Sequence, residues 1–219
     1  MKILALDAAL GPFSTALVLP DRTWADRSNA NDALEAGLSR IDALLKSADI
    51  RLGALDRIAV GVGPGSFTGL RIALSFAKSL AYAAKLPLTG ISSYDAITPD
   101  GAPLPLLALV RGRTGVICAR LTATDGSQRI ACGPTASVLD ELLTGRIASE
   151  DLALAGDTSE VLAELRARRR TVTVVAARAE SPALAIADLA RSHPASPSPH
   201  ALAPDYGEVP AVTAPKVRA

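Results

Sequence analysis

A glycine-rich turn between an apolar strand and an apolar helix constrains the fold of this 219-residue chain more than any other feature. Residues 58–60 predict the end of a buried strand, and residues 72–85 predict the helix. Between them, residues 61–71 read Gly-Val-Gly-Pro-Gly-Ser-Phe-Thr-Gly-Leu-Arg. Four glycines and a proline in so short a segment indicate a sharp turn with unusual backbone angles. The first N–H groups of the helix would point out of this turn, which makes it a candidate anion site.

The turn does not match either of the common phosphate-binding glycine motifs. No Gly-Lys-Ser/Thr follows it, and no lysine lies where it could reach a phosphate. Counted from either of its first two glycines, the sixth position is Ser66 or Thr68, so Gly-x-Gly-x-x-Gly is also absent. Asp7, at the end of the first predicted strand, could still hold a metal–nucleotide complex, as acids do in actin-like ATPases. A small actin-fold ATPase or kinase using Asp7 and the 63–69 turn is therefore an open alternative.

The helix after the turn has more apolar surface than packing on one core requires. Ile72, Phe76 and Leu80 form a bulky flank. The opposite flank consists of small residues: Ala73, Ala77, Ala81 and Ala84. Together they span roughly 200° of the circumference, whereas a single core needs a stripe of little more than about 100°. Either the helix lies between its sheet and a neighbouring helix, or one flank meets a second chain.

Residues 1–98 predict a mixed sheet with helices packed on it. Strands are expected at 3–7, 14–19, 22–27, 58–62 and 87–91, and helices at 31–49, 70–85 and 93–97. Asn31 can cap the first helix. The segment 98–103, Thr-Pro-Asp-Gly-Ala-Pro, breaks the pattern and is the expected boundary between two subdomains.

Residues 99–192 predict a second α/β subdomain with a weaker pattern. Strands are expected at 104–110, 116–122, 128–131, 152–155 and 172–176, and helices at 138–143, 161–168 and 182–192. Residues 193–219 contain six prolines and predict an extended tail.

Cys118 and Cys132 are expected to be core thiols in a reducing cytoplasm. Both lie on a predicted hairpin. If a two-residue loop at 125–126 closes it, paired residues have numbers that add up to 251. The two cysteine numbers add up to 250, so the thiols would not face each other. Two cysteines are also too few for a disulfide framework in a chain of this length.

Charge and histidine content exclude several classes of function. Lys plus Arg (23) nearly equals Asp plus Glu (22), which argues against strong electrostatic binding to nucleic acid or membrane. The sequence contains no run of about 18 apolar residues, so no membrane-spanning helix is predicted. The only histidines, His193 and His200, lie in the tail, so no metal site and no Ser-His catalytic pair is predicted. The arginines at 166–170 end a helix, which favours a solvated helix end over an RNA site.

The segment 63–72, Gly-Pro-Gly-Ser-Phe-Thr-Gly-Leu-Arg-Ile, resembles the signature of the TsaB (YeaZ) family. The matching turn residues are Gly63, Gly65, Ser66, Thr68, Gly69 and Arg71. The opening Ile-Leu-Ala-Leu-Asp strand at 3–7 and the Gly-Ile-Ser-Ser segment at 90–93 also fit the family pattern. The resemblance is strong over residues 1–98 and weak beyond them.

This resemblance implies an α/β, actin-like (ribonuclease-H-like) fold of two subdomains. Relatives are non-catalytic counterparts of TsaD, the subunit that binds metal and transfers the threonylcarbamoyl group to the tRNA adenosine beside the anticodon. They pair with TsaD through helices of the first subdomain, form homodimers through the same surface when alone, and are joined by the ATPase TsaE. The resemblance implies that ATP and metal are bound only by the partner subunits and that this chain binds no cofactor. It also implies that this chain contacts tRNA only through the complex.

A cytoplasmic scaffold subunit without catalytic or metal-binding residues is therefore expected. Helices 31–48 and 70–85 would form the interface, with the following anchors: Leu38, Ile41, Ile72, Phe76 and Leu80. Besides the ATPase or kinase alternative, a metalloprotease (glycoprotease) activity attached to the wider family is disfavoured because no histidine pair is present.

Overall fold

Five strands from the first part of the chain form one mixed sheet in the order β3-β2-β1-β4-β5. The computed structural model describes residues 1–29 and 32–207. Strands β1, β2 and β3 form an antiparallel meander, β4 runs parallel to β1, and β5 runs parallel to β4. The strands are β1 (Ile3–Asp7), β2 (Ser14–Val18), β3 (Thr23–Arg27), β4 (Arg57–Gly63) and β5 (Leu88–Ser92).

Helices cover both faces of this first sheet, which explains why β1 and β2 are buried along their whole length. The covering helices are α1 (Ala33–Ser47), α2 (Phe67–Ala84), α3 (Ser93–Ile97) and α6 (Pro182–Leu189). Alternate side chains of a strand point to opposite faces. Leu4 and Leu6 accordingly pack with α1 and α2, whereas Ile3 and Ala5 pack with α3 and α6. We call this sheet and its helices the first unit.

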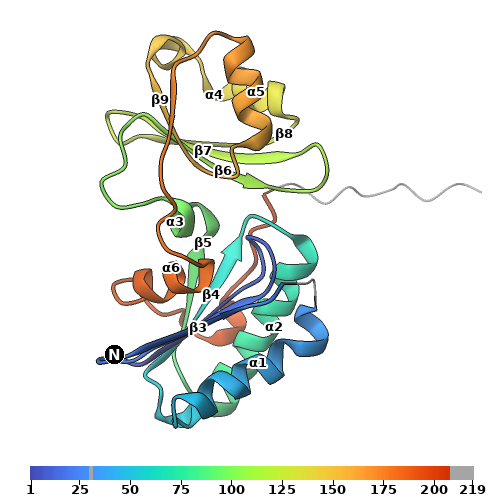
Figure 1. Ribbon diagram of the computed structural model, residues 1–219, viewed down its shortest axis with the longest axis vertical. Helices are drawn as coiled ribbons and strands as arrows, with labels where there is room; N and C mark the ends of the chain where they lie inside the picture. The colour runs from blue at the N-terminus through green and yellow to red at the C-terminus, as the bar shows by residue number, and fades with distance from the viewer. Residues whose placement is uncertain (30–31, 208–219) are drawn as a thin grey trace, which may run out of the picture.

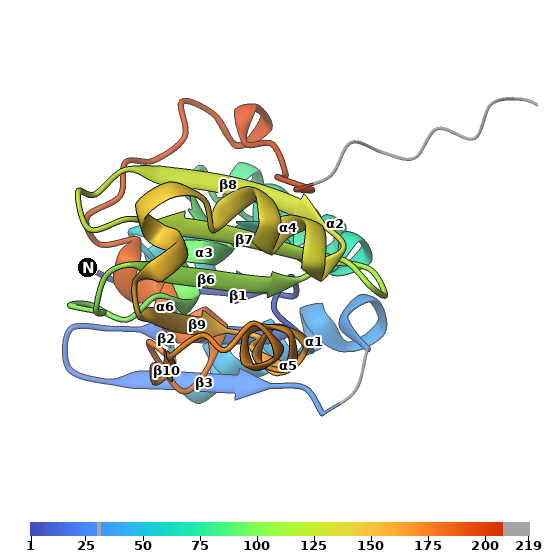
Figure 2. The same ribbon diagram turned by 90° about the horizontal axis from the view of Figure 1, so that it is seen from above.

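The second unit repeats the strand plan, in the order β10-β9-β6-β7-β8. Its strands are β6 (Leu106–Arg111), β7 (Ile117–Thr122), β8 (Gln128–Gly133), β9 (Leu152–Gly156) and β10 (Val172–Val174). Its helices, α4 (Thr135–Leu142) and α5 (Ser159–Ala167), pack on one face of the sheet (Figure 2). Figure 1 shows the two units one above the other. The prediction of two α/β units, each with a mixed sheet and packed helices, is confirmed.

Three short 3-10 helices complete the regular structure: η1 (Leu52–Ala54), η2 (Gly145–Ser149) and η3 (Pro199–Ala201). α2 begins earlier than predicted because the Ser66 side chain accepts a hydrogen bond from the Gly69 N–H at 3.2 Å and caps the first turn. Asn31, the predicted cap of α1, lies outside the described residues. Within residues 1–29 and 32–207, no helix is both long enough and apolar enough to cross a membrane.

Helix α6 belongs to the first unit, although the sequence prediction placed residues 99–192 in the second. The chain leaves β10 and returns to the first sheet, where Ala183, Ile186 and Ala187 are fully buried against β1, β2 and β4. The helix is apolar on almost all sides, so it needs a sheet face to cover. The local sequence pattern predicts an apolar helix here, but it does not predict which of the two sheets the helix covers.

The chain after α6 forms an extended strap, residues 194–207, along the first unit. The Ser196 N–H donates to the Leu88 carbonyl, and the Asp205 N–H donates to the Val62 carbonyl, both at 2.7 Å. Leu202 packs against the core under α2. As far as residue 207, the tail is extended as predicted except for the 3-10 helix η3, and it is docked on the first unit.

The structure contradicts the prediction for the two cysteines. The loop between β7 and β8 has five residues, 123–127, instead of two. The Gly126 N–H donates to the Ala123 carbonyl at 2.9 Å, and the Asp125 carboxylate accepts from the Ser127 N–H at 2.8 Å. The longer loop changes the register, so Cys118 lies directly opposite Cys132 and the two form a disulfide.

Candidate functional site

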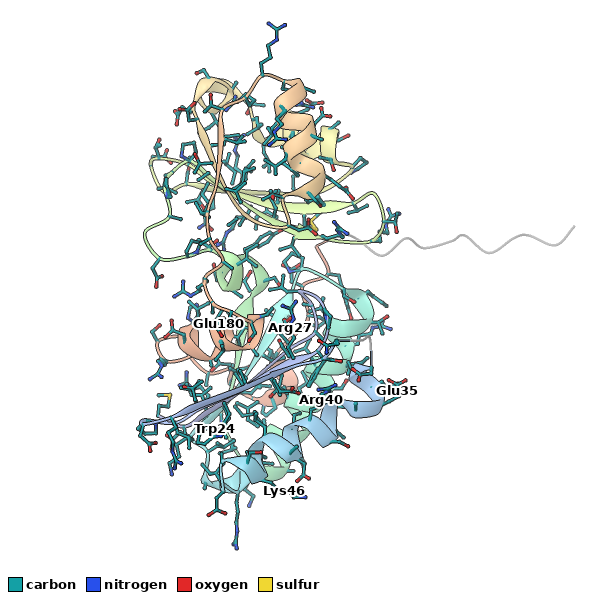
Figure 3. The ribbon with its side chains drawn as sticks, in the orientation of Figure 1. Trp24, Arg27, Glu35, Arg40, Lys46 and Glu180 are labelled. Carbon is teal, nitrogen blue, oxygen red and sulfur yellow. A yellow bond between two sulfur atoms is a disulfide. The ribbon has the colours of Figure 1, made fainter. Side chains whose placement is uncertain are left out.

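A cavity of about 620 Å³ lies between the two units. The first unit contributes the loop after β1, including Leu10 and Gly11, together with Ser66 of the glycine turn. The second unit contributes the ends of β6 and β9, including Arg111 and Asp157. Arg27 and Glu180, which are labelled in Figure 3, line the same cavity. Charged groups of both signs therefore face a shared space.

Arg111 and Asp157 form an exposed ion pair at the second-unit side of the cavity. Arg111 Nε lies 2.9 Å from an oxygen of Asp157, and Ser159 donates its hydroxyl to the same carboxylate at 2.7 Å. Burial raises the pKa of Asp157, but the hydrogen bonds from Ser159 and the nearby Arg111 charge outweigh this and hold the pKa below its usual value. The Arg111 charge is therefore already neutralised by its neighbours.

Asp7 lies below the cavity and not in it. Its side chain is fully buried, and one oxygen accepts a hydrogen bond from the Leu10 N–H at 3.0 Å. The other oxygen has no hydrogen-bond partner among the described residues and lies against Gly61, where an added Cβ would be only 2.2 Å away and 3.3 Å from Ile186 of α6. Burial raises the pKa of Asp7 to about 6, although the Leu10 and Ala9 N–H groups and Arg27 lower it. The carboxyl group is thus enclosed between the sheet and α6.

The glycine turn packs against the loop after β1. A Cβ on Gly69 would lie 1.8 Å from the Ala8 carbonyl oxygen, and one on Gly65 would lie 2.3 Å from the Ala9 carbonyl oxygen. The Ser66 N–H donates to that Ala9 carbonyl at 2.9 Å. Two N–H groups at the start of α2, those of Ser66 and Gly69, therefore already have partners inside the chain. The turn therefore serves close packing between α2 and the loop after β1, and these two N–H groups are not available to an anion.

The other motif residues divide between the turn and the surface. Gly63 is buried, whereas Thr68 and Arg71 are exposed on the first turns of α2. The Arg71 guanidinium lies 4.0 Å from the centre of the Phe67 ring, and its Nε donates to the Tyr206 hydroxyl at 3.3 Å. This stack joins the strap to the beginning of α2.

The predicted anchors on α1 and α2 have different environments. Ile72, Phe76 and Leu80 are half-buried, and Leu38 is 52% exposed. Ile41, in contrast, is only 2% exposed and packs in the core of the first unit, so the prediction that it faces a partner is wrong. The reason is that α1 has two adjacent apolar stripes, and Ile41 belongs to the stripe that faces the sheet.

The outer stripe of α1 and two aromatic side chains of α2 are also exposed. Leu34 is 65% exposed on the same stripe as Leu38, and Tyr82 and Phe67 of α2 are 68% and 49% exposed. We call these residues and the half-buried flank of α2 the helical face: Leu34, Leu38, Phe67, Ile72, Phe76, Leu80 and Tyr82. The sequence prediction did not include Leu34 among the anchors, although its four-residue spacing to Leu38 places both leucines on one stripe of the helix.

Helix α2 is enclosed on three sides, which explains its wide apolar arc. Its alanine flank packs on the sheet, where Ala73 and Ala77 are fully buried. Its bulky flank meets α1, because Phe76 lies directly over Gly37, where an added Cβ would be 2.7 Å from the ring. The strap covers the remaining side, with His200 near Tyr82 at 5.6 Å between ring centres. A neighbouring helix and the strap thus account for much of the arc.

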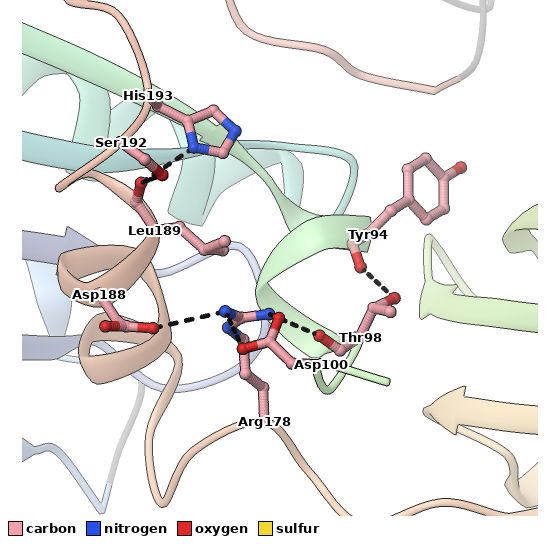
Figure 4. A network of polar contacts seen from close by, with 8 residues as sticks. All are labelled: Tyr94, Thr98, Asp100, Arg178, Asp188, Leu189, Ser192 and His193. Atoms are coloured by element: carbon pink, nitrogen blue, oxygen red, sulfur yellow. Dashed lines mark hydrogen bonds and ion pairs between the residues drawn. The ribbon is translucent and has the colours of Figure 1, made fainter. Parts of the chain in front are cut away.

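An arginine that the sequence prediction missed joins the two chain segments that connect the units. Arg178, on the connection before α6, forms a paired hydrogen bond with Asp100 at 2.8 and 2.9 Å and donates to the Thr98 carbonyl at 3.0 Å, as Figure 4 shows. A carboxylate oxygen of Asp188 lies 3.4 Å from the same guanidinium. Sequence reasoning had no signal for this contact because Arg178 and Asp100 lie 78 residues apart.

Other charged groups are used within the structure. Arg168 bonds to Glu164 at 2.8 Å and to Asp140 at 2.6 Å, and Arg170 donates to the Ile147 carbonyl at 2.9 Å. These basic residues therefore stabilise the second unit. Among residues 1–29 and 32–207, no group of three or more His, Cys, Asp or Glu side chains could hold a metal ion.

Comparison with known proteins adds information on the family. A family model described as TsaD, tRNA N6-adenosine threonylcarbamoyltransferase, matches residues 30–203. The chain is 32% identical over 104 residues to the Bacillus subtilis tRNA threonylcarbamoyladenosine biosynthesis protein TsaB, and 36% identical over 100 residues to the protein of that name from Escherichia coli. These matches cover 46% and 42% of this chain and 45% and 41% of the relatives, so they span less than half of the relatives' length.

The solved structures extend the likeness to the whole fold. YeaZ from Pseudomonas aeruginosa superimposes with a TM-score of 0.68 at 23% identity, covering 94% of this chain and 99% of that one. At this identity the likeness shows the fold alone. The family match covers most of the chain, and the relatives and the fold agree with the signature at 63–72. The chain therefore has the α/β actin-like fold of two subdomains and belongs to the TsaB (YeaZ) family, within the group that the TsaD family model describes.

Proposed function

We propose that this chain is a non-catalytic scaffold subunit that binds a TsaD-type threonylcarbamoyltransferase. Through that complex it supports threonylcarbamoyladenosine modification of tRNA beside the anticodon, in the cytoplasm. The names of the curated relatives, tRNA threonylcarbamoyladenosine biosynthesis protein TsaB, support the process. The helical face is the single observation that carries the scaffold role, because Leu34 and Leu38 are more than half exposed on one stripe of α1.

Exposed leucines on a regular helix suit a protein partner. Apolar side chains at four-residue spacing are the anchors of helix-to-helix docking, and contiguous apolar patches on a monomer commonly mark interaction sites. Ile72, Phe76 and Leu80 pack partly on α1 and the core, and their remaining exposed surface would extend the patch onto α2. The same surface would serve the homodimer when the TsaD-type partner is missing, and a TsaE-type ATPase would join the assembly. Contact with tRNA would then come only through the complex.

The cavity between the units is the observation that favours the alternative, an actin-fold ATPase or kinase. Its volume of about 620 Å³ is within the range of small-molecule sites. Two features support the non-catalytic proposal instead. Asp7 is enclosed under α6, and Arg111 is already paired with Asp157. We therefore assign ATP and metal to the partner subunits and no cofactor to this chain.

Co-purification tests the scaffold role. The tagged chain is mixed with the TsaD-type protein of the same organism, and the complex is quantified by size-exclusion chromatography with light scattering. Leu38→Glu should weaken the complex at least about tenfold, because it places a charge in an apolar contact. Ile130→Glu is the matched control, since Ile130 is 56% exposed but lies on β8 of the second unit. It should bind like the wild type.

Each outcome addresses a separate part of the proposal. If the wild-type chain does not bind the TsaD-type protein, the scaffold role is wrong. If Leu38→Glu and Leu34→Glu both bind like the wild type, the helical face is not the interface. Titration calorimetry with magnesium and ATP tests the alternative, and micromolar binding by the isolated chain would favour an ATPase or kinase.

A further inference from the structure

The Cys118–Cys132 disulfide lies where three distant parts of the chain meet. It joins β7 to β8 in the second unit, with 4.1 Å between the two Cα atoms. Gly207 of the strap lies directly on it, because a Cβ added there would be 2.6 Å from Cys118 Sγ and 2.9 Å from Cys132 Sγ. The same position is 3.1 Å from Pro64 of the glycine turn. Figure 3 shows the sulfur atoms at the side of the second unit that faces the first.

Within the part of the chain that the structure describes, the end of the strap is held by hydrogen bonds and ring contacts to the first unit, among them the Arg71–Tyr206 hydrogen bond at 3.3 Å, and by its contact with the disulfide. The Asp205 N–H donates to the Val62 carbonyl at 2.7 Å, and the Gly207 N–H donates to the Asp205 side chain at 2.8 Å. The Tyr206 ring lies 4.9 Å from that of Phe67. Asp205 and Gly207 are exposed to solvent. These contacts belong to an exposed segment, so they can open without unfolding of either sheet.

We propose that Cys118 and Cys132 form a reversible redox site that controls the docking of strap residues 205–207. The disulfide form holds these residues on the glycine turn and on the start of α2. The dithiol form releases them. This inference does not depend on the scaffold role.

The two cysteines differ in burial, which sets the course of reduction by a dithiol. Cys118 is 2% exposed, whereas Cys132 is half-buried and is the more accessible of the two residues. A thiolate of the reductant attacks Cys132 Sγ, the S–S bond breaks, and Cys118 leaves as a thiolate that takes up a proton. The second thiol of the reductant then attacks the mixed disulfide and releases Cys132 as a thiol. Two electrons pass from the dithiol to the protein, and the reductant becomes a disulfide.

Reduction requires additional space around the two sulfur atoms. Two unbonded thiols must separate to van der Waals distance, and packed interiors resist such an increase in volume. On the inner side, Cys118 packs with the buried residues Tyr94, Ala108 and Val110. The Tyr94 hydroxyl is also 4.0 Å from Cys132 Sγ. The exposed Gly207 lies against both sulfur atoms, so the sulfurs displace the strap when they separate.

Hydrogen exchange followed by mass spectrometry tests the coupling on the full chain. Peptide mapping under non-reducing conditions first identifies the Cys118–Cys132 bond after treatment with oxidised glutathione. With dithiothreitol, the amides of residues 205–207 should exchange at least about tenfold faster than in the disulfide form. A variant with both Cys118→Ala and Cys132→Ala should show no response to dithiothreitol. Cysteines that stay thiols under oxidised glutathione, or strap exchange that is equal in both forms, would overturn the proposal.

If the redox state controls docking of the strap, docking of the strap must in turn shift the equilibrium between disulfide and dithiol, because linkage between two equilibria is reciprocal. Gly207→Ala introduces a side chain that collides with both sulfur atoms and should undock the strap. In glutathione redox buffers, it should shift the equilibrium at least about tenfold toward the dithiol, as measured by alkylation and mass spectrometry. Gly101→Ala is the matched control, with nearly the same backbone angle (φ +68° against +70°) and no neighbour within 4 Å. Equal redox equilibria in the two variants would contradict the coupling.

Discussion

The two units of the molecule have the same strand plan but use it differently. In each unit, three antiparallel strands are followed by two parallel ones, so β1 corresponds to β6 and β4 corresponds to β9. The ends of β1 and β6 carry Asp7 and Arg111. Asp7 is enclosed and has an oxygen without a partner among the described residues, whereas Arg111 is paired with Asp157 at the cavity. The same topology therefore gives one buried charge and one exposed ion pair.

The helices that follow β4 and β9 differ in the same way. α2 has 18 residues and is enclosed by the sheet, α1 and the strap, whereas α5 has nine residues and carries charged groups on its outer side. Helix α2 is held in the first unit by apolar contacts and by the tight glycine turn before it. Stability of the second unit depends partly on arginine contacts such as those of Arg168. Side chains, and not strand order, therefore decide which unit has exposed leucines on a helix and which has exposed ion pairs.

The largest effect is expected when a side chain enters the glycine turn. Gly69→Val should destabilise the protein by about 4 kcal/mol, because its Cβ would overlap the Ala8 carbonyl oxygen, which belongs to the backbone and cannot rotate away. Urea unfolding followed by the fluorescence of Trp24, the only tryptophan, reports on the first unit. Gly53→Ala, with no neighbour within 4 Å, should stay within about 0.5 kcal/mol of the wild type. A similar midpoint for both variants would show that the turn has room to relax.

Truncation of neighbouring positions on α1 should separate its two stripes. Ile41→Ala should cost about 3 kcal/mol, because a buried side chain leaves a cavity. Leu38→Ala should cost less than about 0.5 kcal/mol, because the side chain is 52% exposed. Urea unfolding measures both, and binding to the TsaD-type protein should show the reverse order for the effect on affinity. Equal stability losses would mean that the two stripes are not distinct.

The buried carboxyl group of the first unit should give the protein a pH dependence opposite to that of Asp157. The pKa of Asp7 is raised from 3.8 to about 6 by burial, so between these values the folded state binds more protons than the unfolded state. Stability therefore falls as the pH rises through this window, by up to about 3 kcal/mol at 1.36 kcal/mol per pH unit. Asp7→Asn should abolish this fall. Urea midpoints at pH 4, 5, 6 and 7 check it.

Asp157 provides the contrast for that experiment. Its pKa is lowered, so its contribution to stability is present above the pKa of the unfolded state and is lost as the pH falls through the folded pKa. Asp157→Asn should reduce the loss of stability in acid, and it should leave the fall between pH 4 and 6 unchanged. A pH profile of Asp7→Asn identical to that of the wild type would show that Asp7 is solvated in solution.

The smallest effect is expected for the ion pairs of the second unit. Arg168→Ala should cost about 1 kcal/mol, because the guanidinium is partly buried and bonds to both Glu164 and Asp140. Arg166→Ala, on the same helix end but exposed, should change stability by less than about 0.5 kcal/mol. Thermal unfolding followed by circular dichroism measures both. A larger loss for Arg166 would contradict the assignment of Arg168 as the stabilising residue.

Much of the fold could be predicted from the sequence alone. The first strand was predicted at 3–7 and is observed as β1 (Ile3–Asp7), and the strand predicted at 58–62 is observed as β4 (Arg57–Gly63). The position of the turn and the helix after it were also predicted, and the signature at 63–72 indicated the family. These features are local, because backbone propensity and the period of apolar residues are properties of neighbouring residues.

Tertiary structure decided what local patterns leave open. The apolar period showed that α6 needs a sheet but not which one, and it did not separate Ile41, which faces the core, from Leu38, which faces solvent. Loop length fixed the register of β7 and β8 and placed Cys118 opposite Cys132. Contacts between distant segments, such as Arg178 with Asp100, depend on how the chain crosses between the units. A sequence determines which faces are apolar, whereas the partner of each face depends on the packing of the whole chain.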